Sequence, residues 1–135
     1  MEPVAKWTLV ARAEMIRRIR SEAARQDRSA STLVRIALTL QLEDLRRLAI
    51  DSEAVRLLRD RVGLREPVRL FVLHGGSVPT GCETQPLFIP ESLAAQVELE
   101  ADRLKLATWE IIVWCWDRSE AHLKSMDPAP PDDDQ

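Results

Sequence analysis

The sequence has few cysteines and no long apolar run, and both features restrict the class of protein. Its two cysteines, Cys82 and Cys115, are far apart and do not form a CxxC pair. They cannot build a disulfide framework or a four-thiolate metal site, so we expect a reduced, cytoplasmic protein. No apolar stretch approaches the roughly 18–20 residues that a membrane span needs. The first residues lack a basic region followed by an apolar one, so we expect no secretory signal.

Sequence motifs of catalysis are also missing. We find no meaningful Ser-His-Asp spacing, no glycine-rich phosphate loop and no paired catalytic carboxylates. His74 and His122 stand alone, without the acidic or cysteine neighbours that would complete a metal site. Gly75 and Gly76 are typical of a turn rather than of a phosphate cradle. We therefore expect a protein that is not an enzyme and needs no cofactor or metal.

The formal net charge of −3 hides an uneven distribution along the chain. Residues 1–50 hold ten basic and six acidic residues, a net +4, whereas the remainder carries −7. Nine of the ten bases are arginine, whose planar guanidinium suits phosphate or carboxylate. This asymmetry favours an N-terminal part that binds a polyanion. The alternative is a solvated helix face on which Glu14 and Glu22 are the partners of the arginines.

The first part of the chain predicts a strand and two helices. Residues 5–11 alternate with period two, which indicates a short strand with Trp7 turned toward the core. A helix of about three turns follows, and then a turn at residues 27–31. Ser29 or Ser31 is expected to cap the second helix, because a hydroxyl can accept from its first N–H groups. The apolar surface of that helix is so wide that a partner must cover it.

The rest of the chain predicts further helices and two extended pieces. Asp51-Ser52 is expected to cap a short third helix that ends at Gly63. Residues 68–74 favour a β-strand, and residues 85–89 form another short extended piece. A helix follows, and Thr108 is expected to cap a final one after a turn near Lys105.

A repeat relates the two halves of the chain. When residues 5–38 are shifted by 78 positions, Met15 falls on Leu93 and Val34 on Ile112, and no gap is needed. The turns also coincide, because Asp27 falls on Lys105. The spacing therefore predicts that strand, helix, turn and helix occur twice.

The first of these repeats resembles a known family. Its strand, amphipathic helix, turn of Asp27-Arg28-Ser29-Ala30-Ser31 and second helix resemble the ribbon-helix-helix DNA-binding proteins of the Arc and MetJ type, with Asp27 in place of the customary glycine. Ile89-Pro90-Glu91-Ser92-Leu93 resembles the strand-to-helix junction of the same family, although the second repeat lacks the Arg-Ser turn. Two such units in one chain resemble the tandem accessory proteins of conjugative plasmid and T-DNA transfer.

The resemblance implies a mainly α fold with two ribbon-helix-helix units. We expect the first, DNA-reading unit at residues 1–50 and a degenerate second unit at residues 84–126. Residues 51–83 would form a connector with a short helix and a strand. Residues 127–135 are rich in proline and aspartate and would form a disordered acidic tail.

The resemblance also implies which residues contact DNA. The paired strands would enter the major groove of double-stranded DNA, where Lys6, Thr8 and Val10 would face the base edges. The expected phosphate-binding residues lie at the end of the first strand and the start of the second helix: Arg12, Arg28, Ser29 and Ser31.

The second unit departs from this scheme. Its outward strand residues, Thr84, Pro86 and Phe88, are poor hydrogen-bonding readers of bases. The second unit either completes the fold within the same chain as a pseudo-dimer, or each unit pairs with its copy in another chain. The sequence leaves both arrangements open.

The expected function is sequence-specific binding of double-stranded DNA. The role would be that of a transcriptional repressor, or of a relaxosome accessory protein that helps a relaxase in DNA transfer. The alternative is a protein-interaction module, antitoxin-like or an adaptor, whose acidic C-terminal half meets a basic partner.

Overall fold

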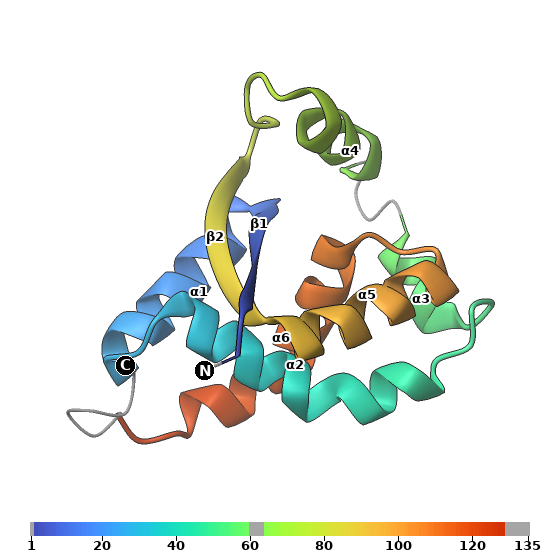
Figure 1. Ribbon diagram of the computed structural model, residues 1–135. Coiled ribbons are helices and arrows are strands. Elements are labelled where there is room, and N and C mark those ends of the chain that lie inside the picture. Colours follow the sequence, from blue (N-terminus) through green and yellow to red (C-terminus); the bar gives the residue numbers. More distant parts are fainter. Residues whose placement is uncertain (1, 60–63, 129–135) are drawn as a thin grey trace.

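The computed structural model describes residues 2–59 and 64–128. In this part of the chain six helices surround one two-stranded sheet, so the expected mainly helical class is confirmed. The elements in chain order are β1 (Val4–Arg12), α1 (Ala13–Gln26), α2 (Ala30–Arg47), α3 (Glu53–Leu58), α4 (Arg65–His74), β2 (Cys82–Pro90), α5 (Glu91–Leu104) and α6 (Thr108–Lys124) (Figure 1). A membrane-crossing helix is not among them, since none is both long and apolar enough. α3 ends at Leu58, so the prediction that this helix runs to Gly63 is wrong. Gly63 itself and most of the predicted acidic tail lie outside the described residues.

β1 and β2 are distant in sequence but pair as one antiparallel sheet. The register places Thr8 opposite Pro86 at the centre of the sheet. Antiparallel strands alternate between hydrogen-bonded and non-bonded pairs, and a proline, which has no N–H, fits only the second kind. The strand pairing that the sequence left open is therefore made within one chain.

The segment β2-α5-α6 repeats β1-α1-α2 in its backbone. Each strand has 9 residues, and α1 and α5 have 14 each. α1 ends at Asp27 and α5 ends at Lys105, and both residues have a φ of 55°, in the left-handed region. This conformation lets the last turn of a helix satisfy its carbonyl groups, and it explains why glycine is usual there. The offset of the repeat agrees with the one expected from the apolar spacing.

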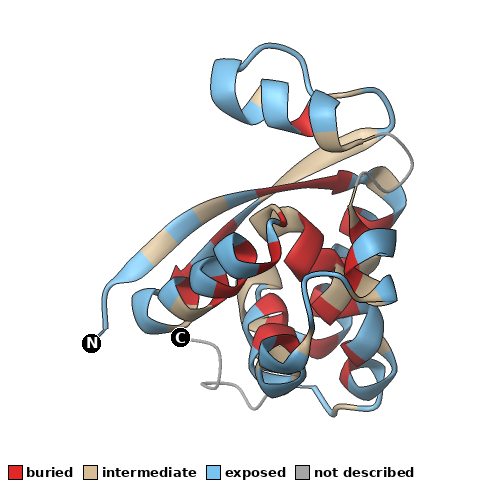
Figure 2. Cartoon of the chain, turned by 90° about the vertical axis from the view of Figure 1, so that its right-hand side faces the viewer, coloured by how far each residue is buried: buried red, intermediate tan, exposed pale blue. Residues whose placement is uncertain are grey.

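α1, α2, α5 and α6 pack on one face of the sheet around a common core, whereas α4 lies on the other side of the sheet (Figure 2). α2 and α6 make the largest helix–helix contact, so each repeat covers the apolar surface of the other. Trp7 packs against this core, as predicted, and its indole N–H donates to Glu98 at 3.3 Å. The largest fully buried side chains include Leu9, Ile16, Ile19, Leu33, Leu38, Leu87, Ile89, Ile111, Ile112 and Trp116.

Two arginines at equivalent positions join the repeats. Arg25 of α1 donates to carbonyl oxygens at the end of α6, at 3.0 and 3.1 Å. Arg103 of α5 donates to carbonyl oxygens at the end of α2, at 2.7 to 3.3 Å. Each arginine also bonds a buried glutamate of its own helix, Glu22 or Glu100. Carbonyl groups at the C-terminal ends of both long helices thus gain hydrogen bonds across the repeat boundary.

The predicted strand at residues 68–74 is wrong, because this segment belongs to α4. Pro67 lies in the first turn, where no intrahelical bond needs its missing N–H. Arg69 and Glu66, three residues apart, pair at 2.6 Å along the helix. Only Val68 is buried, so the apolar run does not mark an internal strand. A short apolar run has no periodicity that separates a strand from a helix.

The helix caps follow the prediction in two of three cases. Ser29 caps α2 and Ser52 caps α3, each by accepting a backbone N–H of its first turn. For α6 the prediction is wrong, since Thr108 is its first residue. There Glu110 reaches back and accepts the N–H of Ala107 at 2.7 Å, which is the carboxylate half of a capping box.

Candidate functional site

The sheet face that points away from the common core is the predicted DNA-reading surface. Lys6 and Thr8 are exposed on it, and their partners Phe88 and Pro86 are exposed as well. The Lys6 ammonium lies 5.9 Å from the centroid of the Phe88 ring, which is a cation–π distance. The centre of this face thus presents one cation, one hydroxyl and two apolar side chains.

Val10, the third predicted base-reading residue, is not open to solvent. It is only 1% exposed and lines a groove together with Val68 of α4 and Trp109 of α6. α4 lies above this end of the sheet (Figure 2). The expectation for Val10 is therefore wrong. Period-two alternation tells which face a residue points to, but not whether another segment covers that face.

The two predicted phosphate-binding hydroxyls have partners inside the fold. Ser29 Oγ accepts the N–H of Thr32 at 3.1 Å as the N-cap of α2. Ser31 Oγ accepts the N–H of Phe88 at 2.9 Å, from the edge of β2. The first of these hydrogen bonds caps α2, and the second holds the start of α2 against the edge of β2.

The two predicted phosphate-binding arginines lie at opposite ends of α1. Arg12 is exposed at the end of β1 and forms no ion pair within the described part of the chain. Arg28 is half-buried and donates to the Gln26 side chain and to the Asp127 carbonyl. A helix of this length spans about 20 Å, so these two arginines do not form one cluster.

Arginines of the first repeat pair with acidic residues of the second. Arg17 and Arg20 both bond Glu83 of β2, at 3.0 and 3.4 Å. Arg18 forms an ion pair with Glu120 of α6 at 3.2 Å. The opposite net charges of the two halves therefore complement each other inside the molecule. Sequence reasoning missed these ion pairs between the repeats, because aligning the repeats does not show which of their residues lie close together.

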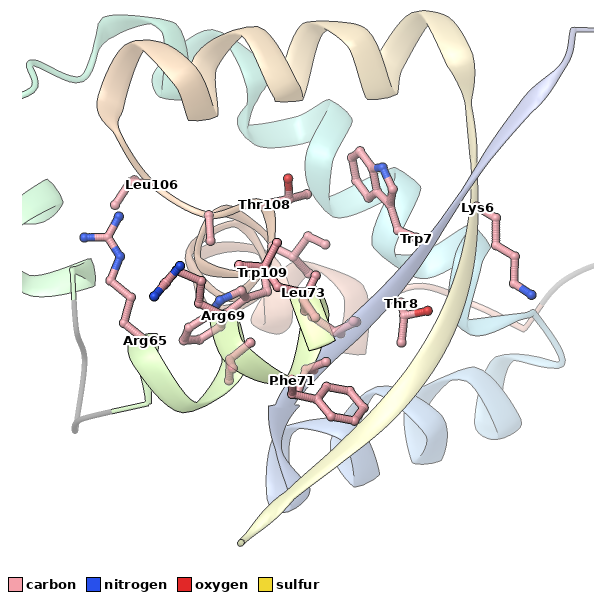
Figure 3. A pocket seen from close by; sticks show the side chains of 16 residues that line it. Lys6, Trp7, Thr8, Arg65, Arg69, Phe71, Leu73, Leu106, Thr108 and Trp109 are labelled. Carbon is pink, nitrogen blue, oxygen red and sulfur yellow. The ribbon is translucent and has the colours of Figure 1, made fainter. Parts of the chain in front are cut away.

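A groove of about 840 Å³ lies between β1, α4 and the start of α6 (Figure 3). Phe71, Val72 and Leu73 of α4 contribute apolar side chains to it, and the last two are 64% and 60% exposed. Trp109 of α6 faces them from the other side (Figure 3). Sequence reasoning missed this groove because it exists only if residues 65–74 form a helix.

The thiols of the chain are not activated. Burial raises the pKa of Cys115 to about 12, and burial also raises the pKa of Cys82 above its ordinary value. A thiol with a raised pKa is a poor nucleophile near neutral pH, because the thiolate is the reactive form. In the described residues no three His, Cys, Asp or Glu side chains gather as a metal site would require.

Comparisons with protein-family models, curated proteins and solved structures gave no match. The ribbon-helix-helix resemblance of the sequence therefore stays a prediction, and any function has to be argued from the geometry above.

Proposed function

We propose that the chain binds double-stranded DNA through the outward face of the β1-β2 sheet. It would do so as a tandem ribbon-helix-helix protein, in the role of a transcriptional repressor or a relaxosome accessory protein. The observation that carries this proposal is the pairing of two β-α-α segments through their strands, with Thr8 and Pro86 at the centre. A two-stranded ribbon on a helical base has the width that the major groove of B-DNA admits.

Base contacts would be concentrated on the first repeat. The Lys6 ammonium can donate to a guanine edge, and the Thr8 hydroxyl can donate to or accept from most bases. Pro86 and Phe88 on the other strand offer only apolar contact, for example with a thymine methyl. Because α4 covers the end of the sheet that holds Val10, the duplex would meet the half with Lys6 and Thr8.

Phosphate contacts would come from both ends of α1. Arg12 is exposed at one end, and Arg28 lies beside the start of α2 at the other. The first turn of α2 adds N–H groups and the positive end of the helix dipole. The ion pairs of Arg17 and Arg20 with Glu83 lie at the surface, with the two arginine side chains 72% and 48% exposed, so exchanging Glu83 for a phosphate costs little.

The proposal is tested by fluorescence anisotropy with a labelled duplex of mixed sequence. The affinity should fall steeply between about 50 and 200 mM salt, because phosphate contacts release counterions. A double variant, Lys6→Ala with Thr8→Ala, should weaken binding about tenfold or more.

The matched control is Arg47→Ala, which also removes one positive charge, at the far end of α2. It should change binding little. Absence of binding at low salt, or equal binding by the double variant and the wild type, would contradict the proposal.

A further inference from the structure

α4 lies on the outward side of the sheet, apart from the four helices of the two repeats (Figure 2). It belongs to the connector between the repeats and stands over one end of the paired strands. Val10 shares the outward face with Thr8, but it lines the same groove as Val68 and Phe71 of α4. α4 therefore covers part of the face that would enter a DNA groove.

The two ends of the sheet differ in what covers them. The register pairs Lys6 with Phe88 at one end and Val10 with Thr84 at the other. Val10 and Phe88 are equivalent residues of the two repeats, yet Val10 is 1% exposed and Phe88 is 49% exposed. The groove at the Val10 end is lined by α4, which belongs to neither repeat, and by Trp109. One end of the outward face is thus open, and the other is closed.

α4 also engages the start of α6. Arg65 of α4 donates to the carbonyl oxygen of Lys105, and its Nε lies 3.5 Å from Oε1 of Glu110 (Figure 3 shows Arg65). The repeat places Lys105 on Asp27, so the turn before α6 corresponds to the turn of Arg28. In the first repeat this turn is the proposed source of phosphate contacts. α4 therefore obstructs the equivalent turn of the second repeat.

Few buried side chains hold α4 in this position. Val68 is the one residue of α4 that is buried, and three other apolar side chains are 44 to 64% exposed: Leu70, Val72 and Leu73. A groove of about 840 Å³ lies between α4 and its neighbours in place of a packed interface. An element with few buried apolar contacts can open at a small fraction of the global unfolding free energy.

The chain after α4 allows such a movement. Gly75, Gly76 and Gly81 all have a positive φ, and a Cβ added at any of them would meet no atom within 4 Å. The loop that joins α4 to β2 is therefore not packed against the body of the protein at these glycines. α4 can leave the sheet without disturbing the core.

We propose that α4 is an autoinhibitory lid on the DNA-binding face. This inference rests on the proposed function, since it concerns the regulation of the same face. A helix with its side chains is about 10–12 Å across, and the major groove is about 12 Å wide. α4 and the paired strands cannot enter one groove together. With α4 in place the duplex meets only Lys6 and Thr8, and with α4 displaced it also meets Val10 and the start of α6.

The proposal is tested by releasing α4 and measuring the affinity for the mixed-sequence duplex at about 100 mM salt. Val68→Asn removes the buried contact of α4 and should raise the affinity about tenfold, because the binding-competent state becomes more populated. The matched control Leu70→Asn makes a similar change at a residue outside the groove, and should bind like the wild type.

A second variant gives a result of unusual sign. Arg65→Gln removes a positive charge and also the ion pair of α4 with Glu110. Loss of a positive charge by itself weakens binding to DNA. Release of the lid should instead strengthen it, so we expect Arg65→Gln to bind the duplex at least about threefold more tightly than the wild type.

Hydrogen exchange followed by mass spectrometry observes the lid directly. In the absence of DNA, Val68→Asn and Arg65→Gln should speed exchange in residues 65–74, whereas Leu70→Asn should not. Added duplex should also speed exchange there in the wild type, because DNA favours the state in which α4 is displaced. A helix with a structural role alone would not respond to DNA in this way.

The outcomes separate the lid from the proposed function. If the wild type binds DNA and the released variants bind no more tightly, the lid is overturned and the proposed function stands. If neither the wild type nor the released variants bind at low salt, the proposed function fails and the lid fails with it. Exchange in residues 65–74 that stays unchanged in both variants, or on addition of DNA, would also overturn the lid. Tighter binding by the released variants alone supports both.

Discussion

Thr8 and Pro86 face each other at the centre of the sheet, and they are also equivalent residues of the two repeats. The offset of 78 residues that relates them also relates Asp27 to Lys105, where the two first helices end. Two equivalent residues that face each other across a sheet lie on either side of a two-fold axis. The two repeats are therefore related by an approximate two-fold axis that passes between Thr8 and Pro86. One chain thus has the symmetry of a two-chain dimer, but its two halves are free to differ.

The first prediction concerns the dependence of stability on protein concentration. Because the strands pair within one chain, unfolding involves a single molecule. The urea midpoint should stay constant when the protein concentration rises about 100-fold. Tryptophan fluorescence measures it, since Trp116 is fully buried in the fold. A midpoint that rises with concentration would mean that the strands pair between chains instead.

The second prediction concerns the arginine that joins the repeats. Arg103→Ala removes the donors to the carbonyl groups at the end of α2 and leaves the buried Glu100 without its partner. We expect a loss of about 2–4 kcal/mol in the free energy of unfolding. The control Arg47→Ala removes an exposed arginine that pairs with Glu43 in its own helix, and should cost less than about 0.5 kcal/mol. Urea titrations of both variants check the difference, and equal losses would contradict it.

Local rules predicted the elements in which local interactions decide the structure. The spacing of Leu9, Ile16 and Ile19 gives the inward faces of β1 and α1, because periodicity depends only on the element itself. The Ser29 hydroxyl predicts the start of α2 for the same reason. The mainly helical class followed from such signals.

Other features depend on contacts between distant residues and could not be predicted in this way. The segment from Val68 to His74 has side chains suited to a strand, but it folds as the helix α4. Val10 alternates with Thr8 like a surface residue, yet α4 and α6 enclose it. The pairing of Arg17 with Glu83 also joins residues far apart in sequence. The groove depends on all of these long-range arrangements.

The third prediction concerns the reactivity of the two thiols. Cys82 is half-buried and Cys115 is buried, and burial raises the pKa of both. At pH 8, iodoacetamide should modify Cys82 slowly and should leave Cys115 unmodified. Both should react quickly in denaturant, where the thiols regain their ordinary pKa. Mass spectrometry of alkylated peptides distinguishes the sites, and equal labelling of the native protein would contradict the described burial of Cys115.

The last prediction concerns the acid limb of stability. The hydrogen bond from Arg25 lowers the pKa of the buried Glu22 below its ordinary value of 4.5. Because the folded-state pKa is lowered, the ionised Glu22 contributes its full stabilisation at pH values above 4.5. This stabilisation is lost as the pH falls through the folded-state pKa. Glu22→Gln should therefore be less stable than the wild type at pH 7, by about 1–2 kcal/mol. The difference should shrink as the pH falls below the ordinary value of 4.5 and through the lowered folded-state pKa. Arg25→Met, which removes the largest cause of the lowered pKa and leaves the Gln26 hydrogen bond to Glu22, should reduce the same pH-dependent part. Urea titrations at several pH values test this, and a constant difference between Glu22→Gln and the wild type would contradict the assignment.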